Sequence, residues 1–184
     1  DDASIRSDTG GFAIAASLGK GASGDVSLGV SVSLNDIGAG RGHSVLAYAD
    51  NSALTSAGPL SISSLSTANI KALALAGSVS IAGSSGSGLA GALAGAGVGT
   101  VNTIEMDIHS KVSGGSTIIA NSGGVGLPGN VSLTATDGSK IQADAIAGAI
   151  SLAGSTQGSG GAIAVGVSVA LNHVANSVLA EVVG

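Results

Sequence analysis

Histidines are the residues of this sequence whose type could support acid–base or metal chemistry. There are three, His43, His109 and His173, and no His-x-x-x-His pair or paired carboxylate accompanies them. A zinc or acid–base site needs such groups spaced so that they converge on one ligand. We therefore expect solvated loop histidines with neither a catalytic nor a metal-binding role.

A polysaccharide-acting enzyme is the alternative that the acidic residues raise. Such a site needs clustered carboxylates, or cations beside carboxylates. Arg6 and Arg41 lie in separate segments, and one Phe, one Tyr and no Trp leave almost no platform for stacking sugars. The acidic residues are scattered: Asp36, Asp50, Glu105, Asp107, Asp137, Asp144 and Glu181. The sequence predicts that the protein is not an enzyme.

Calcium is the one cofactor that the sequence leaves open. Glycine-rich β-rolls bind calcium through a repeated Gly-Gly-x-Gly-x-Asp pattern, and here Asp does not recur after the glycine pairs. Asp1, Asp2 and the Asp137-Gly138 turn are the places where an adventitious ion would bind. No other cofactor is expected.

The composition excludes several classes of protein. Six basic residues and a net charge of −5 cannot supply a nucleic-acid-binding patch. A hydrophobic content of 44% is too high for a disordered chain. Aromatic residues make up 1% of the chain, so a hydrophobic core must be thin. Cysteine is absent, which rules out disulfides and thiol chemistry.

A strand pattern recurs along the chain, and its fullest form is Ala162 to Asn172 (AIAVGVSVALN). Side chains alternate with period two, which is typical of a strand. One face carries Ile163, Val165, Val167, Val169 and Leu171; the other carries Ala164, Gly166, Ser168 and Ala170. We expect the branched side chains to fill a narrow interior. The small-residue face is a candidate surface for packing against other copies.

The same pattern returns as Val26 to Asn35, so the chain is a repeat with copies at about 5–69, 70–140 and 141–184. The opening strands end at Asn35, Asn102 and Asn172, which fit a ladder of side-chain amides; alternatively, Asn merely tolerates the turn. No linker separates the copies, so 1–184 is predicted to be one continuous domain.

The remaining segments are aligned by their alternation. We align Phe12, Ile14, Ala16 and Leu18 with Leu75, Gly77, Val79 and Ile81, and Ile70 with Ile141. The strand after each Asn is placed at 44–49, 103–108 and 177–182, and the next is centred on Leu54 and Val112. Residues 59–67 match 129–137, and 116–128 is interpreted as a loop or additional strand of the second copy.

Short strands, small turns and an apolar face without aromatic rings predict an all-β parallel β-solenoid. Two coil lengths remain open. Coils of roughly 20 to 25 residues would place three coils in each repeat. Alternatively, the pair 70–82 and 89–101 is a hairpin arm that extends one coil well beyond the column.

The block that begins IAGAISLAGSTQGSGG and continues through AIAVGVSVALNHVANSVLAEV resembles the repeats of large secreted bacterial proteins, the filamentous-haemagglutinin-like and leukotoxin-type adhesins. The resemblance covers nearly all of the chain. It implies a right-handed parallel β-helix, an extracellular or cell-surface location, and a role as a shaft or adhesive fibre.

From these observations we expect a structural segment of a surface fibre or giant adhesin that gives length, stiffness and a surface for adhesion. Its partner would be itself, through a homopolymeric fibre or tandem repeats of the chain. The alternative from another class is a membrane-active toxin segment. Ala72 to Val101 carries no charge, but Gly and Ser interrupt it at strand period, so a membrane span is not expected.

Overall fold

The structure is a computed structural model that describes residues 1–40, 42–121 and 128–184, which form strands and no helix. Arg41 lies outside the described residues, as does 122–127 of the stretch interpreted above as a loop. The strands are β1 (Ser4–Gly19), β2 (Ser23–Ile37), β3 (Ser44–Asp50), β4 (Ala53–Ser56), β5 (Leu60–Ser66), β6 (Asn69–Ser84), β7 (Ala90–Ile104), β8 (Asp107–Ser113), β9 (Thr117–Ala120), β10 (Val131–Asp137), β11 (Lys140–Ser155), β12 (Gly160–Val174) and β13 (Ser177–Val182).

The chain is a β-solenoid in which each sequence repeat forms one coil. Every sheet is parallel and pairs equivalent strands of successive coils, in the orders β1-β6-β11, β2-β7-β12, β3-β8-β13, β4-β9 and β5-β10. Ser4 pairs with Asn69 and Asn69 with Lys140, so a coil consumes a whole repeat. Coils of 20 to 25 residues are therefore wrong.

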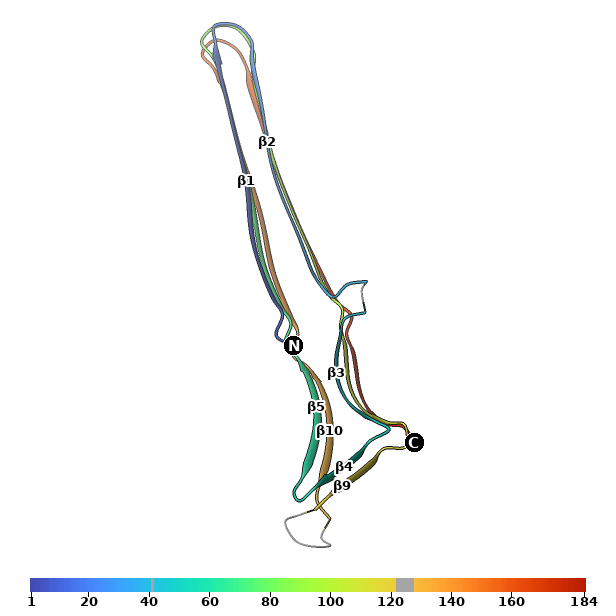
Figure 1. Cartoon of the computed structure of the whole chain (residues 1–184). Coiled ribbons are helices and arrows are strands. Elements are labelled where there is room, and N and C mark those ends of the chain that lie inside the picture. Colours follow the sequence, from blue (N-terminus) through green and yellow to red (C-terminus); the bar gives the residue numbers. More distant parts are fainter. Residues whose placement is uncertain (41, 122–127) are drawn as a thin grey trace.

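Each coil consists of a long arm and a triangular base (Figure 1). The arm is built from the three-stranded sheets β1-β6-β11 and β2-β7-β12, which run side by side and are joined by turns at the tip. The remaining strands form the base, where both termini lie. Strands of 15 and 16 residues at about 3.3 Å per residue make the arm about 50 Å long.

The small-residue face of each arm strand is the inner face, and the branched face points outward. On β2, Ser27, Ser31 and Ser33 are buried, whereas Val30 and Val32 are more than half exposed. On β12, Val165 and Val167 are likewise more than half exposed. The expectation that branched side chains fill the interior is therefore wrong for the arm.

Close contact between the two sheet backbones explains this inversion. A Cβ added at Gly29 of β2 would collide with the carbonyl oxygen of Gly77 and would lie 3.4 Å from that of Gly11. Where backbones approach so closely, the side chains between them are mostly Gly, Ala and Ser, with Val98 and Thr100 of β7 as larger members. Ala74 and Ala94, which are fully buried in the middle coil, show the same small-residue packing.

Val98 of β7 is buried within the arm, but the largest core residues gather at the junction of arm and base. Ile70, Ile104 and Ile108 are fully buried there, and Met106 and Ile37 join the same cluster. The sheets of the arm diverge toward this junction (Figure 1), which gives room for larger side chains. The thin core predicted from the lack of aromatics is thus an Ala-rich seam that widens into one aliphatic cluster.

Several predicted registers differ from the structure. Phe12 pairs with Gly77 rather than Leu75, a slip of two residues that keeps every side chain on its predicted face. The strand after Asn102 is β8, at Asp107–Ser113, so 103–108 was placed four residues too early.

The later segments of the coil also differ. Leu54 pairs with Ile118 of β9, so Thr117–Ala120 is the counterpart of β4 rather than an addition. Leu60 pairs with Val131. The predicted match of 59–67 with 129–137 would pair Leu60 with Asn130, so it was wrong by one residue.

Candidate functional site

The histidines lie apart, and two of them lie on strands rather than in loops. His109 belongs to β8 and pairs with Leu46 and Leu179, whereas His173 is an exposed residue at the base end of β12. His43 precedes β3. Within 1–40, 42–121 and 128–184, no group of three or more His, Cys, Asp or Glu residues could hold a metal ion.

The acidic residues serve mainly as hydrogen-bond acceptors in turns. Asp36 Oδ1 accepts from the amide of Ala39 at 2.8 Å, and Glu105 Oε2 accepts from the amide of Gly40 at 2.7 Å. Asp50 Oδ1 accepts from Ser113 Oγ at 2.6 Å. These bonds tie the connections of one coil to themselves or to the next coil. They give Asp36, Asp50 and Glu105 a structural role in these connections.

Asp137 connects the two walls of the base. Its Oδ1 accepts from the Ser139 amide at 2.9 Å and its Oδ2 accepts from Asn176 Nδ2 at 2.8 Å. Asn176 Oδ1 in turn accepts from the Met106 amide at 3.0 Å. Partial burial acts to raise the pKa of Asp137, but the hydrogen bonds from Ser139 and Asn176 outweigh it and lower the pKa below 3.8.

This bridge predicts an acid-dependent loss of stability. Because the folded-state pKa of Asp137 is depressed, its contribution is present above the unfolded pKa and is lost as pH falls through the folded pKa. We expect Asp137→Asn to lower the free energy of unfolding slightly at neutral pH and to flatten its decline in acid. Urea unfolding at about pH 7 and about pH 3 measures both effects.

Asp144→Asn is the matched control for this prediction, since within the described residues that side chain accepts no hydrogen bond. An equal change in acid slope for both variants would contradict the assigned role of Asp137.

The predicted ladder residues lie one above the other at the base end of the arm. Asn35 Nδ2 donates to Asn102 Oδ1 at 2.8 Å, and Asn102 Nδ2 donates to Asn172 Oδ1 at 2.8 Å. Asn102 is fully buried. The bonds share one direction, so Asn172 Nδ2 is the donor end of the ladder and Asn35 Oδ1 is the acceptor end. Each ladder bond is therefore donated by the Asn of one coil and accepted by the Asn of the next coil along the stack.

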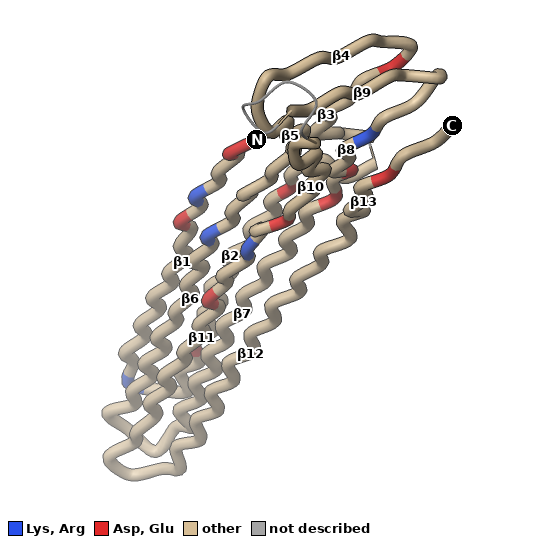
Figure 2. The backbone as a smooth tube through the Cα atoms, turned by 90° about the horizontal axis from the view of Figure 1, so that it is seen from below, with Lys and Arg blue, Asp and Glu red and all other residues tan. Residues whose placement is uncertain are grey.

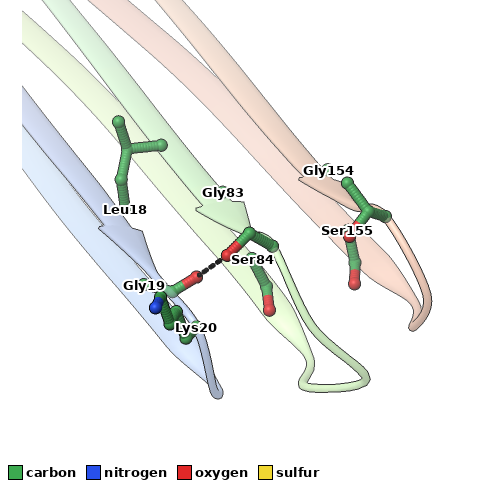
Figure 3. A pocket seen from close by; sticks show the side chains of 9 residues that line it. Leu18, Gly19, Lys20, Gly83, Ser84, Gly154 and Ser155 are labelled. Atoms are coloured by element: carbon green, nitrogen blue, oxygen red, sulfur yellow. Dashed lines mark hydrogen bonds between the residues drawn. The ribbon is translucent and has the colours of Figure 1, made fainter.

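Serines at the arm tip fasten each turn to the preceding coil. Ser84 Oγ donates to the Gly21 carbonyl at 2.7 Å, and Ser155, its register partner, donates to the carbonyls of Gly86 and Gly88 at 3.0 Å. Neither serine carries a signal in the sequence beyond the abundance of Gly and Ser in these turns. Ser84 and Ser155 line an open hollow (Figure 3). The volume of this hollow is about 750 Å³. In the same hollow, Ser85 Oγ donates to the Gly19 carbonyl at 3.3 Å.

The hollow at the tip offers little chemistry. Its lining is Leu18, Gly19, Lys20, Gly83, Ser84, Ser85, Gly154, Ser155 and Thr156. Lys20 supplies the charge, and among the described residues that line the hollow there is neither a carboxylate nor a histidine to activate a serine hydroxyl as a nucleophile. The serine hydroxyls are already used in the turn contacts.

The largest feature of the arm is an uncharged outer surface on the sheet β2-β7-β12, which we call the grooved face. Its members are Val26, Leu28, Val30, Val32 and Leu34 of β2; Leu93, Gly95, Gly97, Gly99 and Val101 of β7; and Ile163, Val165, Val167, Val169 and Leu171 of β12. Most charged residues gather nearer the base (Figure 2).

A shallow groove follows the middle strand of this face. Register places Gly97 between Val30 and Val167, and the flanking Gly95 and Gly99 repeat the arrangement. A Cβ at Gly97 or at Gly99 would meet nothing within 4 Å. The backbone floor is therefore bare at Gly97 and Gly99, between two rows of branched side chains, whereas at Gly95 the Leu28 side chain lies 3.0 Å from where a Cβ would stand.

The other side of the arm, which we call the second outer face, is apolar but lacks such a groove. It presents Phe12, Ile14, Leu18, Leu75, Ile81, Ile146, Ile150 and Leu152 from β1, β6 and β11. The glycine gaps of its middle strand are covered, since the Phe12 ring lies over Gly77 and Leu18 lies over Gly83, whereas a Cβ at Gly148 or Gly154 of β11 would meet nothing within 4 Å. Large side chains of the first coil therefore fill the space above glycines of the second coil.

The predicted packing face lies on the inner side of β12. A Cβ at Gly166 would be 3.0 Å from the Ala147 carbonyl oxygen of β11, and Ser168 and Ala170 line a hollow with Ala143 and Ala145. Ala164, with Gly166, Ser168 and Ala170, therefore faces the neighbouring sheet of the same chain. All four residues are nonetheless exposed on this terminal strand, and their packing against other copies stays a prediction.

Comparisons with protein-family models, with curated proteins and with solved structures found no match to this chain. Within the described residues, no helix is long and apolar enough to cross a membrane. The resemblance to secreted adhesins stays a prediction.

Proposed function

We propose that the chain is a structural segment of a secreted bacterial surface fibre or giant adhesin, in which stacked coils present broad sheet faces. The observation that carries the proposal is the three-coil parallel register, in which every strand of a complete coil pairs with its counterpart in the next coil. Stacking of this kind extends by repetition. A fibre built this way would lie outside the cell, as the adhesin resemblance implies.

The size of the coil favours breadth over length. One coil consumes a repeat of about 65 to 71 residues and raises the stack by about 4.8 Å. The three coils therefore extend the stack by only about 14 Å, while the arm reaches about 50 Å to the side. Such a segment is an inefficient way to gain length and an efficient way to build a wide, flat wall.

Axial growth would use the open strand edges of the terminal coils. The amides of Ser177 and Val183 point to β8, because they donate to Met106 and Val112. By the alternation of a parallel strand, the amide of Ala180 points to the open edge of β13. Unpaired edges of this kind are templates for another strand, and the donor end of the asparagine ladder lies at the same edge.

Electron microscopy of the purified chain at high concentration tests the proposal. We expect filaments that grow along the coil axis, and we expect Ala180→Pro to shorten them by removing one edge donor that no strand within the chain uses. A tandem chain of two copies should double the extent along that axis. Monodisperse short particles for both the single and the tandem chain would contradict the proposal.

A further inference from the structure

We propose that the grooved face is a pairing surface for a second copy of this chain, packed face to face. Its side chains are branched and more than half exposed at Val30, Val32 and Val167. Apolar patches of this extent on a soluble surface mark interaction sites. The partner surface must be apolar, since no charged residue lies on the grooved face between its two ends, which are marked on β2 by Val26 and Leu34.

The shape of the face suits a copy of itself. The row Val165, Val167 and Val169 forms a ridge beside the bare floor of Gly97 and Gly99. In a two-fold pair, the ridge of each copy enters the groove of the other, so the same contact forms twice. Sheets that pack through branched side chains interdigitate in this manner. The second outer face has no such open floor along its middle strand, because Phe12 covers Gly77 and Leu18 covers Gly83.

The available area agrees with a reversible pair. Three strands about 50 Å long and about 4.8 Å apart present about 700 Å² on each copy. Placing a ridge in the central groove offsets the copies by one strand, which leaves about two thirds of the face in contact, or about 900 Å² in total. That total lies near the lower limit for specific interfaces, so we expect pairing in the micromolar range.

A lipid bilayer is the competing occupant of an apolar face, and the edges of the arm disfavour it. Hydrocarbon leaves no partner for unpaired backbone groups, so open sheets do not lie in it. Both arm sheets end in open strands, at β1 and β11 and at β2 and β12. A second copy leaves those edges in water. Pairing of faces does not depend on axial stacking, so the inference goes beyond the proposed function.

Sedimentation velocity of the full chain over a range of concentrations tests the pairing. Val167→Lys places one charge from each copy in the centre of the contact. It should therefore weaken dimerisation by about a hundredfold. Ile150→Lys is the matched control, because Ile150 is 58% exposed on the second outer face. We expect it to leave the dimer unchanged. Far-ultraviolet circular dichroism checks that both variants keep their strands.

Gly97→Val distinguishes a shaped contact from general stickiness. The substitution makes the face more apolar but fills the groove, so we expect the dimer to weaken by about tenfold. A stronger dimer would overturn the ridge-in-groove arrangement. Equal losses for Val167→Lys and Ile150→Lys would overturn the assignment to this face.

Phosphatidylcholine–phosphatidylglycerol vesicles separate the copy from the bilayer. A chain that stays monomeric at all concentrations, binds these vesicles and loses that binding with Val167→Lys would overturn the proposal in favour of lipid. Loss of axial filaments with Ala180→Pro, with dimers retained, would leave the pairing intact. The two proposals therefore fail separately.

Discussion

Replacing Gly29 by valine should destabilise the arm more than any other single substitution considered for this chain. The added Cβ would collide with the Gly77 carbonyl of the facing sheet and would lie 3.4 Å from the Gly11 carbonyl. Both obstacles are backbone, which cannot swing aside as a side chain can. We expect the free energy of unfolding to fall by about 3 kcal/mol or more, measured by urea unfolding.

Gly97→Val is the control, because it makes the same change on the outer side of the adjacent strand. A Cβ there meets nothing within 4 Å, and its neighbours in register are Val30 and Val167. Valine suits a strand better than glycine and gains cross-strand contacts, so stability should stay level or rise by up to about 1 kcal/mol. Similar losses for the two variants would mean that the sheets do not touch at Gly29.

Asn102→Leu should show the second largest effect, by cutting the asparagine ladder at its centre. Leucine has a similar volume but removes both the bond accepted from Asn35 and the bond donated to Asn172. Asn102 is fully buried and Asn35 nearly so, which means that water cannot replace the lost partner at Asn35. We expect a loss of about 1 to 3 kcal/mol in the free energy of unfolding.

Asn172→Leu is the matched control within the ladder. Asn172 accepts one ladder bond and is exposed in the terminal coil. Its replacement removes one ladder bond rather than two, so the loss should be clearly smaller than that of Asn102→Leu. A loss as large as that of Asn102→Leu would show that burial and ladder bonding are not the source of the effect.

The position of the ladder and the register of β2, β7 and β12 could be predicted from the sequence, whereas that of β1 was wrong by two residues. Identical residues in Val26–Asn35 and Ala162–Asn172 align the first and third copies, and both segments pair in that register with β7. Shorter segments failed where they lack distinctive residues. Segment 103–108 alternates as well as β8 does, so periodicity had no means of choosing between them.

The contacts of the candidate sites depended on residues that the sequence does not mark. Asp137 and Asn176 are 39 residues apart, and only the closure of the base brings them within 2.8 Å. The groove over Gly97 exists because two other coils supply Val30 and Val167 on either side.

The sequence by itself determined that the chain is a stack of parallel strands, because alternation with period two and matching repeats leave few other arrangements. It did not determine which face of each strand is the interior. Period two separates two faces without ranking them, and the usual preference for buried branched residues pointed the wrong way. The tertiary structure decided it through the distance between the arm sheets: with backbones in contact at Gly29 and Gly77, only small side chains fit inside.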